Sequence, residues 1–133
     1  MGDHTLTVPS GLDVHYHDSG NEPTDRPPLV LLHGGGPGAN AWSNFGRNFA
    51  VFAKSARVLA VDMPGFGGSG KRTEHPQYFT YAAGVLAELL DALSIHTVDL
   101  VGNSLGGLAA LRLALTSPAR VSALCLVGSA GLG

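Results

Sequence analysis

The sequence predicts an α/β fold with three layers and a mostly parallel sheet. Short apolar runs, typical of strands buried on both faces, alternate with longer segments of helical periodicity. Strands that alternate with helices pair in parallel, because each helix carries the chain back across the sheet. The apolar runs are 29–32 (LVLL), 57–62 (RVLAVD), 98–101 (VDLV) and 121–127 (VSALCLV).

Residues 12–17 alternate between apolar and polar side chains, and apolar residues just upstream indicate a partner strand, which predicts a β-hairpin. His15 and His17 occupy polar positions of this pattern, so we expect both to face solvent. The apolar positions are Leu6, Val8, Leu12, Val14 and Tyr16.

Three helices are expected between the later strands. The segment 42–52 places four aromatic residues at helical spacing, and these are expected in the core. The segment 81–93 carries one apolar stripe, and a third helix follows Ser104. The four aromatic residues are Trp42, Phe45, Phe49 and Phe52.

Composition excludes several classes of function. The 133 residues carry a net charge of -2 with both signs scattered, so no basic surface for nucleic acid is expected. The one cysteine, Cys125, lies in an apolar run and is expected to be buried, which leaves no disulfide framework or thiol metal cluster. The polar N-terminus and short apolar runs indicate neither a signal peptide nor a membrane span. We therefore expect a cytoplasmic protein.

The stretch Gly102-Asn103-Ser104-Leu105-Gly106 fits the pattern G-x-S-x-G, in which a serine occupies a sharp turn between a strand and a helix. Glycines two residues to either side let the two backbones pass closely, and the turn exposes the serine hydroxyl. An apolar run precedes this stretch and a helix rich in alanine and leucine follows it. We predict that Ser104 is a nucleophile; the alternative is a structural turn in which Ser104 caps the helix.

A glycine-rich loop, HGGGPG (33–38), directly follows the run 29–32. Free backbone N–H groups at the carboxyl end of a strand can bind a phosphate or an oxyanion. No Gly-Lys-Ser/Thr follows the glycines, and their spacing is not G-x-G-x-x-G, which disfavours a nucleotide phosphate. Beside a serine nucleophile, the loop predicts an oxyanion hole.

These motifs resemble those of the α/β-hydrolases and, more narrowly, the meta-cleavage product hydrolases. Those enzymes break a carbon–carbon bond in ring-opened dienoate products of aromatic or steroid catabolism. The resemblance rests on HGGGPGA (33–39), WSNF (42–45), RN (47–48) and GNSLGG (102–107), and it extends from about residue 12 to residue 133. It implies a serine hydrolase that needs no metal or organic cofactor and whose partner is a small-molecule dienoate.

The resemblance assigns roles to individual residues. Ser104 matches the nucleophile, and the backbone N–H groups of Gly35 and Leu105 match the oxyanion hole.

Gly36, Asn44 and Asn103 match positions that line the polar end of the substrate site. Side-chain amides can orient a carboxylate and an enol oxygen without adding charge. On the residues alone, Asn44 is equally compatible with a helix surface, and Asn103 with a turn that tolerates unusual backbone angles.

All six histidines precede Ser104 in the chain. In the α/β-hydrolase fold the order is serine, acid, histidine, so the resemblance implies that the last two, and the lid, lie beyond Gly133. We expect residues 1–133 to form the N-terminal part of a single α/β-hydrolase domain, with a sheet truncated after the strand 121–127. Because an unactivated serine is a weak nucleophile, this chain alone is expected to be nearly inactive.

His33 is the nearest substitute for the missing histidine, although the family places a loop-holding residue there. Asp62 ends another strand within D-x-P-G-x-G, a pattern found across many α/β-hydrolases and interpreted as structural. No spacing argument selects a relay between these two residues.

The function predicted is hydrolysis of a carbon–carbon bond in a 2-hydroxy-6-oxo-dienoate through an acyl-enzyme on Ser104. The alternative on the same fold is an esterase or an enzyme similar to proline iminopeptidase. An alternative of another class is an inactive, truncated interaction protein. A homo-oligomer is compatible with the first prediction.

Overall fold

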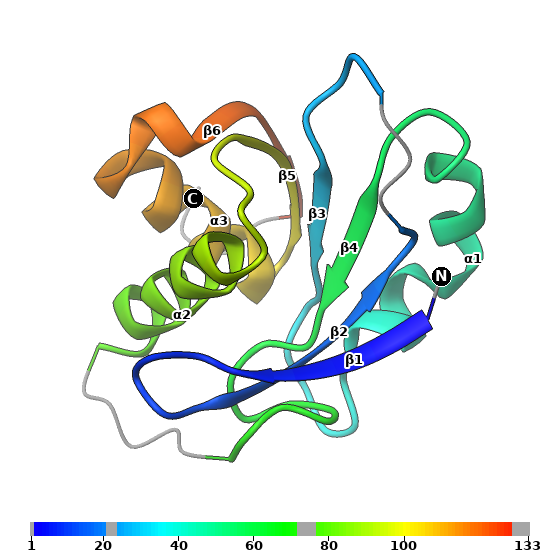
Figure 1. The fold of residues 1–133 in the computed structure, drawn as a ribbon. Coiled ribbons are helices and arrows are strands. Elements are labelled where there is room, and N and C mark those ends of the chain that lie inside the picture. The colour runs from blue at the N-terminus through cyan, green and yellow to red at the C-terminus, as the bar shows by residue number, and fades with distance from the viewer. Residues whose placement is uncertain (1, 21–23, 72–76, 129–133) are drawn as a thin grey trace.

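The computed structural model describes residues 2–20, 24–71 and 77–128, and its strands form a six-stranded sheet in the order β1-β2-β4-β3-β5-β6 (Figure 1). The strands are β1 (Gly2–Thr7), β2 (Asp13–Asp18), β3 (Leu29–Leu32), β4 (Val58–Val61), β5 (Val98–Asn103) and β6 (Val121–Val127). The helices are α1 (Ala41–Phe52), α2 (Tyr78–Ala92) and α3 (Leu105–Thr116), with a short 3₁₀ helix at Pro118–Arg120.

The sheet combines an antiparallel hairpin with a parallel section. β1 pairs with β2 and β2 with β4, both in antiparallel orientation. β4, β3, β5 and β6 run parallel to one another. The predicted mostly parallel sheet is therefore confirmed, and so is the predicted hairpin.

The helices cover the two faces of the sheet, which confirms the three predicted layers. α1 lies on one face, and α2 and α3 lie together on the other (Figure 1). Phe45 and Phe49 of α1 pack on Leu31 and Ala60 of the central strands. On the opposite face, the apolar stripe of α2 packs with β3, β4, β5 and α3 in a larger cluster.

The register of the parallel strands places the ends of three strands side by side. Leu32, the last residue of β3, is level with Val61 of β4 and with Gly102 of β5. The residues that follow these positions therefore meet at the carboxyl edge of the sheet, where parallel α/β sheets bind their ligands. This edge carries the glycine-rich loop, Asp62 and Ser104.

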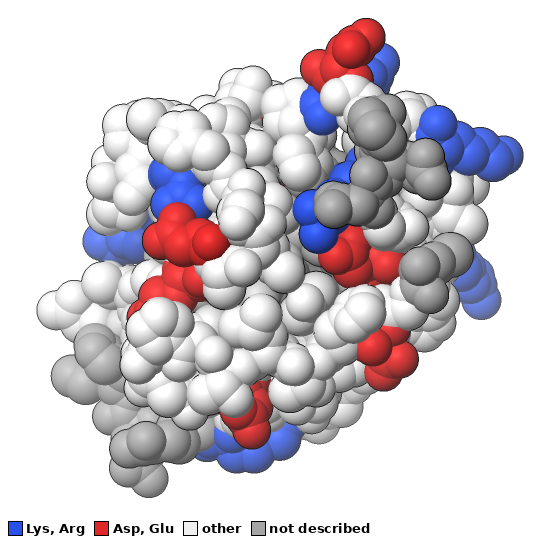
Figure 2. All heavy atoms as spheres, in the orientation of Figure 1, with Lys and Arg blue, Asp and Glu red and all other residues white. Residues whose placement is uncertain are grey.

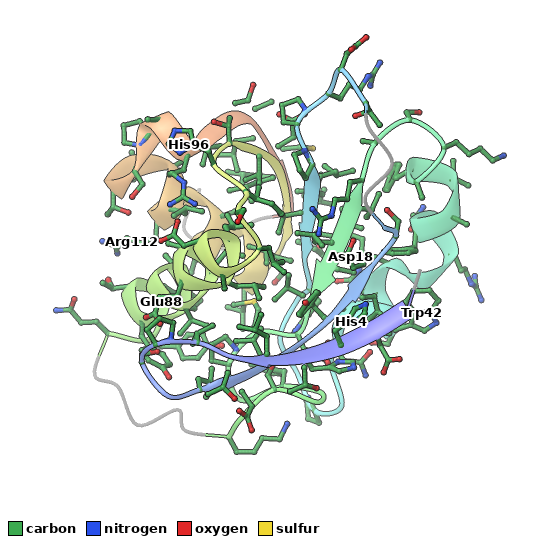
Figure 3. The ribbon with its side chains drawn as sticks, in the orientation of Figure 1. His4, Asp18, Trp42, Glu88, His96 and Arg112 are labelled. Atoms are coloured by element: carbon green, nitrogen blue, oxygen red, sulfur yellow. The ribbon has the colours of Figure 1, made fainter. Side chains whose placement is uncertain are left out.

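The β1–β2 hairpin is fastened at both its turn and its strands. The N–H of Ser10, in the turn, donates to the Glu88 carboxylate of α2 at 2.7 Å, and Figure 3 shows Glu88 beside the hairpin turn. Within β2, the carbonyl oxygen of Asp13 accepts the N–H of Gly70 at 2.8 Å. The hairpin thus contacts both α2 and the turn that follows β4.

The prediction that Trp42 lies in the core is wrong. Phe45 and Phe49 are buried as expected, but 46% of Trp42 is exposed. Trp42 lies in the first turn of α1, beside the antiparallel hairpin, and its ring packs on His17 with the centroids 4.6 Å apart (Figure 3). Trp42, the first of the four aromatic residues of this helix, therefore packs on His17 of the hairpin and not on the parallel strands.

Cys125 is a second correction, because its side chain is exposed. Leu124 and Leu126 of β6 pack against the cluster on the α2 and α3 side, so the alternate residues face the other way. α1 packs on β2, β3 and β4 on that other face. The outward residues of β6 are left uncovered within the described part of the chain, and Val127 is 49% exposed.

Acidic and basic side chains are interspersed over the face shown in Figure 2, without a large area of one sign. In the described ranges, the helices are too short or too polar to cross a membrane.

Candidate active site

Ser104 lies at the junction of β5 and α3 in a strained backbone conformation, with φ 53° and ψ -115°. Its N–H donates to the carbonyl oxygen of Val127 at 2.9 Å, and its carbonyl oxygen accepts the N–H of Gly107 at 2.9 Å. Ser104 is the N-cap residue of α3, but its side chain makes no capping hydrogen bond, unlike the structural alternative considered from the sequence. Its hydroxyl makes no hydrogen bond with any residue that the structure describes.

The two glycines of the serine motif are required by close backbone approach. A Cβ atom on Gly102 would lie 2.6 Å from the Cα atom of Gly107. One on Gly106 would lie 2.5 Å from the carbonyl oxygen of His33. The start of α3 therefore packs directly on the end of β3, next to the glycine-rich loop.

The glycine-rich loop lies against the serine turn. A Cβ atom on Gly34 would be 3.5 Å from the Cβ atom of Ser104, and one on Gly35 would overlap the Leu105 side chain. Among the described residues, the N–H groups of Gly35 and Leu105 have no acceptor. Two unpaired donors next to a half-buried serine are what stabilisation of an oxyanion requires.

Asn44 joins the loop to the serine turn. Its Oδ1 atom accepts the N–H of Gly34 at 3.0 Å and the side-chain amide of Asn103 at 2.8 Å. One carbonyl oxygen thus holds two segments that are far apart in the sequence. The structure therefore brings together five of the six predicted site residues: Ser104, Gly35, Leu105, Asn44 and Asn103.

Gly36 directly follows Gly35, and no hydrogen bond links it to Ser104, Asn44 or Asn103 in the described part of the chain. It is exposed, and its φ of 114° favours glycine. Gly36 lines an open hollow of about 450 Å³ together with Asn40, Phe66 and Lys71.

His33 is fully buried and holds the loop, as the resemblance implied. The N–H of Met63 donates to His33 Nε2 at 2.9 Å. The other ring nitrogen, Nδ1, must then carry the proton, and it donates to the carbonyl oxygen of Gly34 at 2.7 Å. Burial lowers the pKa of His33, which keeps the ring neutral. With its lone pair engaged by Met63, His33 is not free to accept a proton from Ser104.

The prediction that His15 faces solvent is wrong, because both of its ring nitrogens contact carboxylates. Its Nδ1 atom lies 2.7 Å from a carboxylate oxygen of Asp62, and its Nε2 atom lies 3.1 Å from a carboxylate oxygen of Asp3. Burial opposes a charge on His15, but hydrogen bonds to Asp3 and then Asp62 raise its pKa overall. Burial likewise opposes a charge on Asp62, and the N–H groups of Ala41 and Gly68, followed by His15, nevertheless lower its pKa.

Sequence reasoning missed this pairing for a clear reason. The period of two shows on which face of the hairpin His15 lies, but not what lies across from it. The available signal was the D-x-P-G-x-G pattern at Asp62, whose glycines indicate a tightly packed turn. Within the ranges 2–20, 24–71 and 77–128, no three His, Cys, Asp or Glu side chains are placed to hold a metal ion.

Comparison by sequence finds one protein family and several individual proteins that are similar to this chain. Residues 27–132 match the family described as alpha/beta hydrolase fold. A 2-hydroxy-6-oxononadienedioate/2-hydroxy-6-oxononatrienedioate hydrolase of Burkholderia vietnamiensis is 48% identical over 118 residues, covering 88% of this chain and 40% of that protein. A 2-hydroxymuconate semialdehyde hydrolase of a Pseudomonas species is 45% identical over 130 residues, covering 94% of this chain and 43% of that protein.

Solved structures show the same similarity. The meta-cleavage product hydrolase CumD from Pseudomonas fluorescens, as a serine-to-alanine mutant complexed with acetates, superposes with a TM-score of 0.85 at 31% identity. The match covers 96% of this chain and 45% of that structure. A serine hydrolase involved in carbazole degradation, CarC, gives a TM-score of 0.87 at 31% identity, over 98% of this chain and 48% of its own. The chain therefore spans less than half the length of these relatives.

Proposed function

The chain belongs to the alpha/beta hydrolase fold family, and from that premise we propose that it carries the nucleophile and oxyanion hole of a hydrolase that cleaves a carbon–carbon bond in a 2-hydroxy-6-oxo-dienoate. The observation that carries this proposal is the joint placement of Ser104 and the glycine-rich loop. Asn44 holds the loop and the serine turn together through hydrogen bonds of 3.0 and 2.8 Å. The names of the relatives, all hydrolases of 2-hydroxy-dienoates or of a muconate semialdehyde, supply the substrate class.

In the proposed reaction, the dienol substrate first ketonises. The Ser104 hydroxyl then passes its proton to a general base as its oxygen attacks the distal ketone carbon, and the N–H groups of Gly35 and Leu105 stabilise the oxyanion. The adjacent carbon–carbon bond breaks, and its electron pair passes to the dienoate fragment, which takes up a proton and leaves as a 2-hydroxydienoate. Water hydrolyses the acyl-enzyme to a carboxylic acid and restores the serine.

Asn103 and Asn44 are proposed to orient the dienoate end of the substrate, together with Gly36. The Oδ1 atom of Asn44 is already occupied by two donors. Its own NH₂ group is therefore the part that can donate to a carboxylate or enol oxygen. This use of amide donors fixes the substrate without placing a charge beside the reacting carbon.

The base that activates Ser104 is proposed to come from outside these 133 residues. All six histidines precede Ser104, whereas the fold places the histidine after the serine and the acid. His33, the one closest to the loop, has its lone pair engaged by Met63. By itself, the segment 1–133 is expected to be nearly inactive.

We place the reaction in the cytoplasm, because an exposed free thiol such as Cys125 is suited to a reducing compartment. The proposed partner is a small-molecule dienoate, and the reaction as written uses no metal or organic cofactor. Self-association into a homo-oligomer is part of the same proposal.

Ester hydrolysis is the second candidate, since a membrane phospholipase A gives a TM-score of 0.80 at 31% identity over 99% of this chain. An ester would use the same serine and oxyanion hole. A non-catalytic interaction protein is the third candidate, and it requires a partner that covers β6.

The test uses the intact protein purified from its own cells, with a 2-hydroxy-6-oxo-dienoate, a simple ester and an aminoacyl-proline substrate. We expect loss of the yellow dienoate absorbance, abolished in Ser104→Ala and retained in the matched surface variant Ser55→Ala. Mass spectrometry after rapid quenching should find the acyl group on Ser104. Cleavage of the ester without loss of dienoate colour would replace the first candidate with the second, and inactivity on all three substrates would favour the third.

A further inference from the structure

A buried carboxylate near the candidate site joins three segments of the chain. Asp62 follows β4 and is 3% exposed. One of its oxygens accepts the N–H of Ala41 at 2.7 Å. The other accepts the N–H of Gly68 at 2.9 Å and the His15 ring at 2.7 Å. These donors come from the start of α1, from the turn after β4, and from β2.

The surrounding packing allows little freedom for this arrangement. A Cβ atom on Gly67 would overlap the Asp62 carboxylate, and one on Gly68 would lie 2.8 Å from His15 Cγ. The N–H of His15 also donates to the Ser69 hydroxyl at 2.9 Å, and that hydroxyl donates to the carbonyl oxygen of Asp62 at 2.7 Å. The ring and the carboxylate are thus fixed by backbone as well as by each other.

Helix α1 extends from this carboxylate to the candidate site. Ala41 is its first residue, and Asn44 follows three residues later, about 4.5 Å along the helix axis. Asn44 holds the N–H of Gly34 and the side chain of Asn103. Because one helical turn moves as a unit, a displacement of the Asp62–Ala41 contact also displaces the acceptor that holds the loop.

We propose that His15 is a positioning residue for the reaction proposed above: by donating from Nδ1 to Asp62 it fixes the first turn of α1, and through Asn44 the glycine-rich loop. The proposal rests on the proposed function for its catalytic consequence, but its structural part does not. His15 touches neither Ser104 nor the loop, so it acts on the loop only through Asp62 and the first turn of α1.

A positioning role for His15 can be distinguished from a role in fastening β1, because the two ring nitrogens contact different groups. Nδ1 faces Asp62, whereas Nε2 faces Asp3 of β1 and so ties β1 to β2. The ring of His17 also packs on the His15 ring, with the two centroids 5.1 Å apart, whereas the Ser69 hydroxyl accepts the backbone N–H of His15 and not a ring nitrogen. If His15 only fastened β1, the Nε2 contact would be the important one.

The experiment uses two substitutions that each keep one nitrogen. In His15→Asn the amide NH₂ lies near the position of Nδ1, and in His15→Gln it reaches the position of Nε2. We expect kcat for the dienoate to fall about tenfold or more in H15Q but only about twofold in H15N, within the roughly hundredfold that a 1 Å misplacement can cost. KM should change little in either variant, because an oxyanion hole acts in the transition state. Asp3→Ala serves as the control for loss of the β1 contact, because alanine leaves no acceptor for Nε2.

A second readout is independent of turnover: the hydrogen-exchange rate of the Gly34 N–H, measured by NMR in the same proteins. We expect faster exchange in H15Q than in H15N and no change in Asp3→Ala. The reverse order, or equal rates and equal kcat in the two variants, overturns the proposal. If the wild-type protein leaves the dienoate unchanged, the proposed function fails, and the exchange rates still decide whether His15 positions the loop.

Discussion

At the scale of single residues, Ser104, the proposed nucleophile, is held in an unfavourable backbone conformation. A non-glycine residue with φ 53° costs about 1–3 kcal/mol and persists only where its surroundings impose it. Here those surroundings are the Ser104 N–H bond to Val127 and the close approach of Gly102 to Gly107. In this conformation Ser104 occupies the N-cap position of α3, but its hydroxyl makes no capping hydrogen bond.

The first residue-scale prediction concerns these glycines. Gly102→Ala should lower the free energy of unfolding by about 1–3 kcal/mol, because its Cβ would meet backbone atoms that cannot yield. Gly84→Ala is the matched control: its Cβ would meet nothing within 4 Å in the middle of α2, so it should add about 0.5–1 kcal/mol. Urea unfolding followed by circular dichroism measures both. Equal effects of the two substitutions would contradict the packing described for the serine turn.

The second residue-scale prediction is a pH dependence. The pKa of Asp62 is lowered in the folded chain, so its contribution to stability is present above its ordinary value of 3.8 and is lost as pH falls through the folded pKa. The pKa of His15 is raised, so its contribution is present below its ordinary value of 6.5 and is lost as pH rises through the folded pKa. The pair should therefore stabilise the fold most between these two ordinary values.

Asp62→Asn tests this expectation. The substitution should cost about 1–3 kcal/mol near pH 5, where the pair is fully charged, and less in acid and above neutrality. Asp25→Asn, an exposed position, should show no such window. The measurement is the urea midpoint at a series of pH values, and a cost that stays constant from pH 3 to 8 would rule out the charged pair.

At the scale of elements, α1 is the component that links the hairpin to the site. Asn40 caps its N-terminus by accepting the N–H of Ser43 at 2.8 Å, and the Ser43 hydroxyl accepts the N–H of Asn40 at 3.3 Å. Asp62 receives the N–H of Ala41 beside this cap. The first turn of α1 is thus held by two independent acceptors.

The element-scale prediction is that Asn40→Ala costs about 1 kcal/mol of stability, as loss of an N-cap usually does. Asn48→Ala, on the exposed side of α1, is the control and should be neutral or slightly stabilising because alanine favours helix. Thermal unfolding compares the two. A cost for Asn48→Ala equal to that of Asn40→Ala would mean that the cap contributes nothing specific.

The strands and helices could be predicted wherever the local pattern of apolar residues determines them. The apolar runs 29–32 and 121–127 and the helix after Ser104 are found where the sequence predicts them, and α2 begins at Tyr78, three residues earlier than its apolar stripe. The predictions for Trp42, Cys125 and His15 were wrong for a common reason. Each depends on which element lies across from the residue, and periodicity shows the face of an element but not its neighbour.

The candidate site divides in the same way. The Ser104 turn and the glycine-rich loop are local motifs and could be recognised directly. The contacts of Asn44 with Gly34 and Asn103 span 10 and 59 residues, and that of His15 with Asp62 spans 47. Contacts at such separations follow from the order of strands in the sheet, which no short motif encodes.

At the scale of the whole molecule, the two faces of the sheet are unequally covered. α2 and α3 cover one face up to β6, whereas α1 packs on β2, β3 and β4 of the other. The outward side of β6 therefore carries an exposed cysteine and a half-exposed Val127.

The molecule-scale prediction is that Cys125 in the folded 133-residue chain reacts with iodoacetamide at a rate close to that of the same chain in urea. Cys125→Ser should abolish labelling, which shows that the signal comes from this thiol. Strong protection of the folded thiol would mean that another surface covers β6, and gel filtration would show whether that surface is a second copy.

The hydrogen bond from Ser104 to Val127 also has a consequence for biosynthesis. A chain leaves the ribosome N-terminal end first, and the contacts among His15, Asp62, Ala41, Asn44 and Gly34 all connect residues that precede the serine turn. These contacts can therefore form while Ser104 is still inside the exit tunnel. Ser104 gains its last backbone partner only when Val127 has emerged, so the Ser104 turn and the Leu105 N–H join a glycine-rich loop that Asn44 already holds.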